Sequence, residues 1–205
     1  MDLIEKASQG YEFAEYIDIL NGKLNKDKGE DKLLDYIYLN VRRMRRIMKQ
    51  YEPAEYLVKL IREMNQPITW LAISEGWCGD AAHVLPVLFK LSNLSFKPRL
   101  KIVFRDENPE LMDRFLTNGS RSIPKIIAID NDGEVITEWG PRPNKAQGIV
   151  ESYKRGESIY KNYDELSSAL QHWYHRDRYL SIEEEIIEFI EPQIIAQRYK
   201  EAIGF

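Results

Sequence analysis

The sequence has 205 residues, of which 43% are hydrophobic and 30% are charged, and its formal net charge is −4 at pH 7. This length and composition predict a globular protein with a buried core, and the mild acidity gives no general attraction to nucleic acid. No apolar run approaches the length of a membrane span, and residues 1–10 lack the apolar stretch of a secretion signal. The single cysteine excludes an intrachain disulfide. We therefore expect a cytoplasmic protein without nucleic-acid or membrane partners.

The first third of the chain predicts three amphipathic helices. Apolar residues recur at spacings of three and four in Tyr11–Leu20, Leu33–Met48 and Ala54–Met64, and the polar segment Asn21–Asp31 between the first two predicts a loop. The second helix also carries a basic stretch. We interpret it as a solvated helix face rather than a phosphate site; its residues are Arg42, Arg43, Arg45, Arg46 and Lys49.

From Gln66 onward the hydrophobic period changes to that of strands. Four runs have strand composition: Ile68–Ser74, Leu100–Phe104, Ile126–Asp130 and Val135–Trp139. Helical patterns follow the first two runs, so these strands pair in parallel, whereas the turn Asn131-Asp132-Gly133 makes the last two antiparallel. The predicted fold class is α/β, a mixed sheet of about four strands flanked by helices.

The last part of the chain is helical and aromatic. The predicted helices are Lys145–Lys154, Tyr163–Tyr174 and Ser181–Ile190. Ser181 with Glu184 has the pattern of a capping box at a helix start, and Pro192 is expected to end that helix or open the next. We divide the chain into an N-terminal helical extension (1–52), a central domain (53–155) and a C-terminal helical extension (156–205).

The sequence Trp77-Cys78-Gly79-Asp80-Ala81 lies between the first strand and a predicted helix over Ala81–Leu94. A thiol at this position meets the unpaired N–H groups and the positive dipole end of the helix, both of which favour the thiolate. We therefore expect Cys78 to be exposed and reactive.

Several residues in register resemble the thioredoxin family over residues 53 to about 155. Trp77-Cys78-Gly79 resembles the start of the active-site motif, and Pro86 the proline of the following helix. Ile123-Pro124 resembles the segment with a cis-proline opposite the cysteine, and Gly140 a glycine beside the site. The resemblance implies a thioredoxin-like fold with Cys78 as the catalytic thiol. It also implies a substrate groove lined by Trp77, Gly79, Ile123, Pro124 and Gly140.

Two departures from the family pattern concern the same chemical step. The second cysteine of the family motif is replaced by Ala81, and the family's buried aspartate by Ala72. Without a resolving thiol a mixed disulfide cannot be released intramolecularly, so dithiol reduction is not expected. Asp80 stands where the family often has proline. It is a good helix starter whose charge opposes a thiolate at Cys78, and Arg121 is the predicted counter-charge.

Three functional hypotheses follow. The first is thiol-disulfide exchange or deglutathionylation through a mixed disulfide at Cys78. Its substrate is a protein disulfide or a glutathione adduct, with glutathione as the candidate co-substrate and no bound cofactor. The second is a non-catalytic binding module for a protein partner, whose helical extensions contact the partner or form a homodimer. The third is a glutaredoxin-like role with glutathione and a shared iron–sulfur cluster, which Gly79-Asp80-Ala81 disfavours because it departs from that family's motif.

The histidines do not predict a base or a metal site. His83 lies about 140° around the helix from Cys78, so we expect a surface or packing residue. His172 and His175 lack a distal ligand pair, and no metal is predicted. The neighbouring aromatic group is expected to pack its helix; it consists of Trp173, Tyr174 and Tyr179.

Overall fold

The computed structural model describes residues 1–26 and 32–203 and has the predicted α/β architecture. Its four-stranded mixed sheet has the strand order β2-β1-β3-β4. The strands are β1 (Ile68–Ser74), β2 (Pro98–Phe104), β3 (Lys125–Ile129) and β4 (Val135–Trp139). Strand β1 pairs in parallel with β2 and antiparallel with β3, and the hairpin of β3 with β4 is antiparallel. Both pairing predictions are confirmed.

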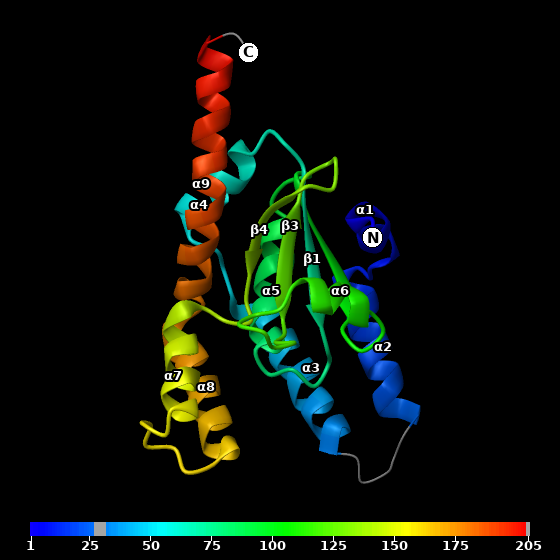
Figure 1. The fold of residues 1–205 in the computed structure, drawn as a ribbon, viewed down its shortest axis with the longest axis vertical. Helices are drawn as coiled ribbons and strands as arrows, with labels where there is room; N and C mark the ends of the chain where they lie inside the picture. The colour runs from blue at the N-terminus through cyan, green and yellow to red at the C-terminus, as the bar shows by residue number, and fades with distance from the viewer. Residues whose placement is uncertain (27–31, 204–205) are drawn as a thin grey trace.

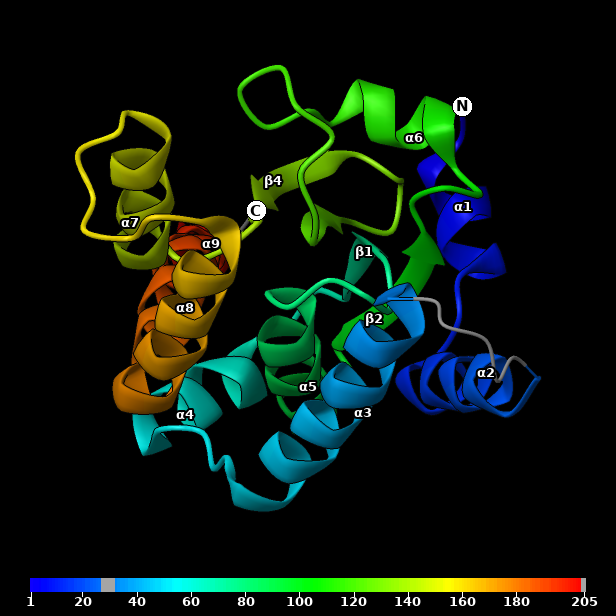
Figure 2. The ribbon, with the colours of Figure 1, turned by 90° about the horizontal axis from the view of Figure 1, so that it is seen from below.

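Helices surround this sheet on several sides. Their bounds are α1 (Leu3–Gln9), α2 (Phe13–Lys26), α3 (Lys32–Gln50), α4 (Glu55–Glu63), α5 (Ala81–Ser92), α6 (Pro109–Arg114), α7 (Asn144–Lys154), α8 (Tyr163–Asp177) and α9 (Leu180–Ile203). Figure 1 shows α9 as a long helix beside the β4 edge, with α7 and α8 at its lower end. Figure 2 shows α5 and α3 on one side of the sheet and α6 on the other.

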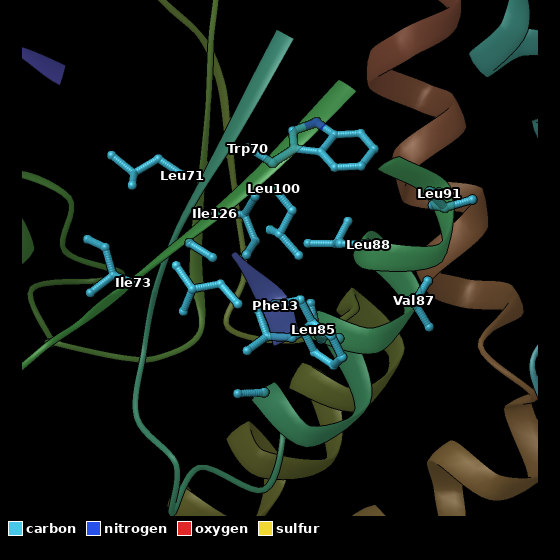
Figure 3. Close-up of a cluster of buried hydrophobic side chains, with 14 of the residues drawn as sticks. Phe13, Trp70, Leu71, Ile73, Leu85, Val87, Leu88, Leu91, Leu100 and Ile126 are labelled. Atoms are coloured by element: carbon cyan, nitrogen blue, oxygen red, sulfur yellow. The ribbon is translucent and has the colours of Figure 1, made fainter. Parts of the chain in front are cut away.

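The core lies on both faces of the central strand β1. Trp70 points toward α5, where it meets Leu88, whereas Leu71 and Ile73 point to the opposite face (Figure 3). These four residues are at most 3% exposed. A strand buried on both faces explains the almost continuous apolar run from Ile68 to Ser74.

The predicted loop between the first two helices begins too early. Helix α2 continues through Gly22 to Lys26, so the loop prediction is wrong for residues 21–26, while residues 27–31 lie outside the described part. The apolar stripe explains the extension, because Leu20 is fully buried and Leu24 packs against the same core one turn later. The sequence also missed α1, whose first N–H groups are capped by the Asp2 carboxylate.

Two predictions about the C-terminal helices are wrong. Helix α9 begins at Leu180, and the Ser181 hydroxyl donates a hydrogen bond to Asp177 (2.6 Å) instead of capping the helix. Pro192 lies inside α9 on its exposed side, and the helix continues past it. An isoleucine stripe at intervals of four carries the helix across this point, because every member is buried; it consists of Ile182, Ile186, Ile190 and Ile194.

Both helical ends pack onto the same core as the sheet. The Tyr51 hydroxyl donates to the Glu183 carboxylate (2.7 Å), and the Trp139 indole N–H donates to Glu185 (2.6 Å), which ties α9 to the end of α3 and to β4. These contacts pack the terminal helices against the domain that carries Cys78.

Within the described ranges, none of the helices combines the length and apolarity needed to cross a membrane.

Candidate functional site

Cys78 lies in the short loop between β1 and α5, opposite the segment before β3. Its Sγ accepts a hydrogen bond from the backbone N–H of Ala81 (3.4 Å) and donates one to the carbonyl of Ile123 (3.2 Å). The Ile123–Pro124 peptide bond is cis. The predicted register of this proline segment with Cys78 is therefore confirmed.

The expectation of an exposed thiol at Cys78 is wrong. The residue is only 6% exposed, because the loop and the Ile123 segment enclose its sulfur. The pKa of the Cys78 thiol is raised to about 12, chiefly by burial and also by the nearby Asp80 charge. The N–H groups of Ala81 and Asp80 and the Arg142 charge oppose this rise without reversing it. The site therefore favours the protonated thiol.

Asp80 forms a buried ion pair rather than a helix cap. Its carboxylate accepts hydrogen bonds from the Arg142 guanidinium (2.7 and 3.0 Å) and from the Tyr174 hydroxyl (2.8 Å), and it makes no capping bond to α5. The predicted counter-charge, Arg121, instead forms two 2.6 Å hydrogen bonds with Asp113. The cation that faces Asp80 is therefore Arg142.

Helix α8 also packs against His83, which lies in α5 beside Asp80. The His83 ring stacks on Tyr174 at 4.2 Å, and its Nε2 lies 2.7 Å from the Gln171 side-chain oxygen. His83 is 1% exposed, and burial lowers its pKa to about 4, so the ring is neutral near pH 7. It is a packing residue, as predicted, and its neighbours come from the C-terminal extension.

Gly140 occupies the close contact expected of a glycine beside the site. Its φ is +110°, and a Cβ placed on it would lie 2.3 Å from the carbonyl oxygen of Pro124. Real Cβ atoms do not approach a backbone oxygen this closely, so glycine is required here. The backbone of Gly140 therefore packs directly against the backbone of Pro124.

A cavity of about 450 Å³ opens beside Cys78. The predicted site residues in its wall are Trp77, Cys78, Gly79, Asp80, Arg121 and Ile123, whereas Pro124 and Gly140 are not part of the wall. The rest of the wall comes largely from α3 and α8. These two helices lie on either side of the loop between β1 and α5 in Figure 2.

Three arginines in this wall were not among the predicted site residues. Arg142 follows Gly140 by two positions, a spacing that places it near the site. Arg105 lies over the Trp77 ring at 4.9 Å. The prediction of a solvated face is wrong for Arg43, which is half-buried and lines the cavity, and helical spacing from the buried Asn40 and Ile47 was an available signal. The remaining members of the basic stretch are exposed, as predicted; they are Arg42, Arg45, Arg46 and Lys49.

The comparison with protein families agrees with this geometry. The family model described as Thioredoxin matches residues 28–154, which is more than half of the chain. The chain belongs to the thioredoxin family. The matched range contains the four strands, the loop that carries Cys78 and the Ile123–Pro124 segment facing it. None of the curated proteins compared with the chain matches it.

Two solved structures share the fold over nearly the whole chain. One is a protein of unknown function from Pseudomonas aeruginosa, with 17% identity and a TM-score of 0.55, and the other is an HIV epitope scaffold, with 16% identity and the same TM-score. Each match covers 90% of this chain and 99% of the other. The shared fold therefore extends beyond the segment that the thioredoxin family model matches.

Proposed function

We propose that this thioredoxin-family protein is a binding protein in which Cys78 acts as a neutral thiol and not as a nucleophile. The observation that carries the proposal is the hydrogen bond from the buried Cys78 Sγ to the Ile123 carbonyl. Only the protonated thiol can donate that bond, so forming the thiolate would break it and place two acceptors against each other.

The charges around Cys78 support the same conclusion. Reactive cysteines sit in partly exposed, electropositive surroundings that lower the thiol pKa. Here burial and the Asp80 carboxylate raise it, and the Arg142 charge is engaged with Asp80 at 2.7 Å. The cation that favours a thiolate at Cys78, Arg142, is therefore already paired with the Asp80 carboxylate.

The two positions that would complete dithiol chemistry are apolar. Ala81 and Ala72 are both fully buried, so neither a resolving thiol nor a buried acid is present at these sites. The sequence contains no other cysteine that could resolve a mixed disulfide. The absence of a resolving thiol and of a buried acid therefore supports a binding role for the fold rather than dithiol catalysis. A cytoplasmic location belongs to this proposal, because a lone reduced thiol persists there.

Monothiol exchange with a protein disulfide or a glutathione adduct is the second candidate. Cys78 lines the cavity and receives the Ala81 N–H at the head of α5, which favours this candidate. In this reaction the Cys78 thiolate would attack one sulfur of the disulfide, and the other sulfur would leave and take a proton. A free thiol such as glutathione would then release Cys78 and become part of a new disulfide.

The rate of alkylation separates the two functions. At neutral pH we expect iodoacetamide to modify Cys78 more than about tenfold slower than N-acetylcysteine, because very little thiolate forms when the thiol pKa is raised. The rate should rise with pH well beyond the ordinary thiol pKa of about 8.5. The protein unfolded in urea, which should react like the free thiol, is the control. A neutral-pH rate within tenfold of the free thiol, or above it, would favour monothiol exchange.

A further inference from the structure

The cavity beside Cys78 has features of a small-molecule site. We propose that it binds a small organic anion, with the negative group at Arg43 and a flat apolar body against the aromatic side chains of the wall. This names the ligand class for the binding function proposed above and rests on it. The volume of about 450 Å³ lies within the usual range of small-molecule sites, roughly 300–1,000 Å³.

The wall of the cavity is rich in positive charge. Among the described residues, four arginines line it and Asp80 is the only carboxylate; the arginines are Arg43, Arg105, Arg121 and Arg142. Three of them have carboxylate partners, which are Asp106 for Arg105, Asp113 for Arg121 and Asp80 for Arg142. This charge distribution is complementary to an anion.

Among these four arginines, Arg43 alone has no carboxylate partner in the part of the chain that the structure describes. Among the described residues, no carboxylate lies within ion-pair distance of its guanidinium, which instead donates a hydrogen bond to the side-chain oxygen of Asn40 (2.7 Å). Burial lowers the Arg43 pKa, and the neighbouring charge of Arg46 lowers it further. A bound anion would offset both effects, and a carboxylate or phosphate group fits the fork of a guanidinium.

Asn40 connects Arg43 to the cysteine loop. Its amide N–H donates to the carbonyl of Gly76 (3.0 Å), while its oxygen accepts from Arg43. A Cβ on Gly76 would lie 2.4 Å from a terminal methyl of the Leu20 side chain, so a larger residue there would force that methyl to shift. Asn40 therefore links the Arg43 guanidinium to the loop that carries Cys78, and an anion bound to Arg43 would lie in the same cavity as that loop.

Exposed apolar side chains on α3 and α8 gather at the same cavity. Tyr36 is 39% exposed, Leu39 is 43% exposed and Tyr163 is 67% exposed, and all three line the wall together with Trp77. Large apolar side chains that remain exposed in a group mark binding surfaces. An apolar or aromatic body on the ligand would cover them.

Two dyes that share an aromatic skeleton test the proposal. Anilinonaphthalene sulfonate is an anion, and phenylnaphthylamine is its uncharged counterpart; both increase in fluorescence on binding. We expect the sulfonate to bind with one site per chain and to bind Arg43→Gln about tenfold more weakly, because a charge-assisted hydrogen bond is lost. Arg45→Gln, which changes an exposed arginine of the same helix, should leave the affinity unchanged. Neither substitution should affect binding of the neutral dye.

A second variant and a competition experiment keep the result interpretable. Arg43→Lys should retain more of the sulfonate affinity than Arg43→Gln, which separates charge from loss of the fold. Phenyl phosphate and benzoate should displace the sulfonate where phenol does not, and the better competitor identifies the preferred head group. Equal sulfonate affinity in Arg43→Gln and the wild type, or no saturable sulfonate binding, would overturn the proposal. Fast alkylation of Cys78 would instead overturn only the neutral-thiol function.

Discussion

Replacing Gly140 with alanine is expected to lower the free energy of unfolding by about 3 kcal/mol or more. The new Cβ would lie 2.3 Å from the Pro124 carbonyl oxygen and 3.3 Å from its carbonyl carbon, so it meets backbone atoms that cannot move independently. The φ of +110° adds to the cost, because this region is accessible almost only to glycine. Urea denaturation would measure this loss as a lower midpoint, provided that the slope of unfolding free energy against urea concentration stays the same.

Gly148→Ala is the matched control for this substitution. Gly148 lies inside α7, and a Cβ placed there has no atom within 4 Å. Alanine is therefore expected to stabilise the protein by about 0.5–1 kcal/mol through its higher helix propensity. If Gly140→Ala changed the unfolding free energy by less than about 1 kcal/mol, a size expected of an ordinary substitution, the close packing of Gly140 against Pro124 would be refuted.

The second large effect is expected from Arg142→Met, which leaves the Asp80 carboxylate buried without its cation. The side chains of Asp80 and Arg142 are 11% and 15% exposed, and removing one partner of such a pair typically costs about 3–5 kcal/mol. The Tyr174 hydroxyl remains as a donor but carries no charge. Thermal and urea unfolding should both show the loss.

Arg121→Met provides the comparison on the surface. The Arg121–Asp113 pair has equally short hydrogen bonds, but both side chains are about half exposed, so water replaces the lost contact. Its removal should change stability much less than the removal of Arg142. The double variant Asp80→Asn with Arg142→Met should recover part of the loss, because the unpaired charge is gone. If Arg142→Met and Arg121→Met lowered the unfolding free energy equally, the burial of the Asp80–Arg142 ion pair would be contradicted.

The sequence predicts the central fold well because local and tertiary signals agree there. The change of hydrophobic period at Gln66 and the turn at Asn131-Asp132-Gly133 indicate the strands and their pairing, and the structure confirms both. At the ends of the chain the local signals compete with the core. Gly22 and Pro192 are helix breakers by propensity, but a buried apolar stripe keeps α2 helical past Gly22, and another keeps α9 helical past Pro192.

The site is less predictable because burial is a property of the whole fold. The position of Cys78 at a helix start predicts a low pKa when only the local helix is considered, since the N–H groups and the dipole favour the thiolate. The Ile123 segment and the Asp80 carboxylate reverse that effect by enclosing the sulfur and adding negative charge. Likewise, the partners of Asp80 are Arg142 and Tyr174, far away in the sequence, so helix-start chemistry alone could not identify them.

The titration of Cys78 tests the neutral thiol most directly. The chain has one cysteine, so protein labelled with carbon-13 at the cysteine Cβ gives a single signal whose chemical shift reports the protonation of the sulfur. We predict a midpoint well above the ordinary value of about 8.5 and toward about 12. A midpoint at or below the ordinary value would show that the site stabilises a thiolate, and would contradict the assignment of Cys78 to binding rather than to exchange.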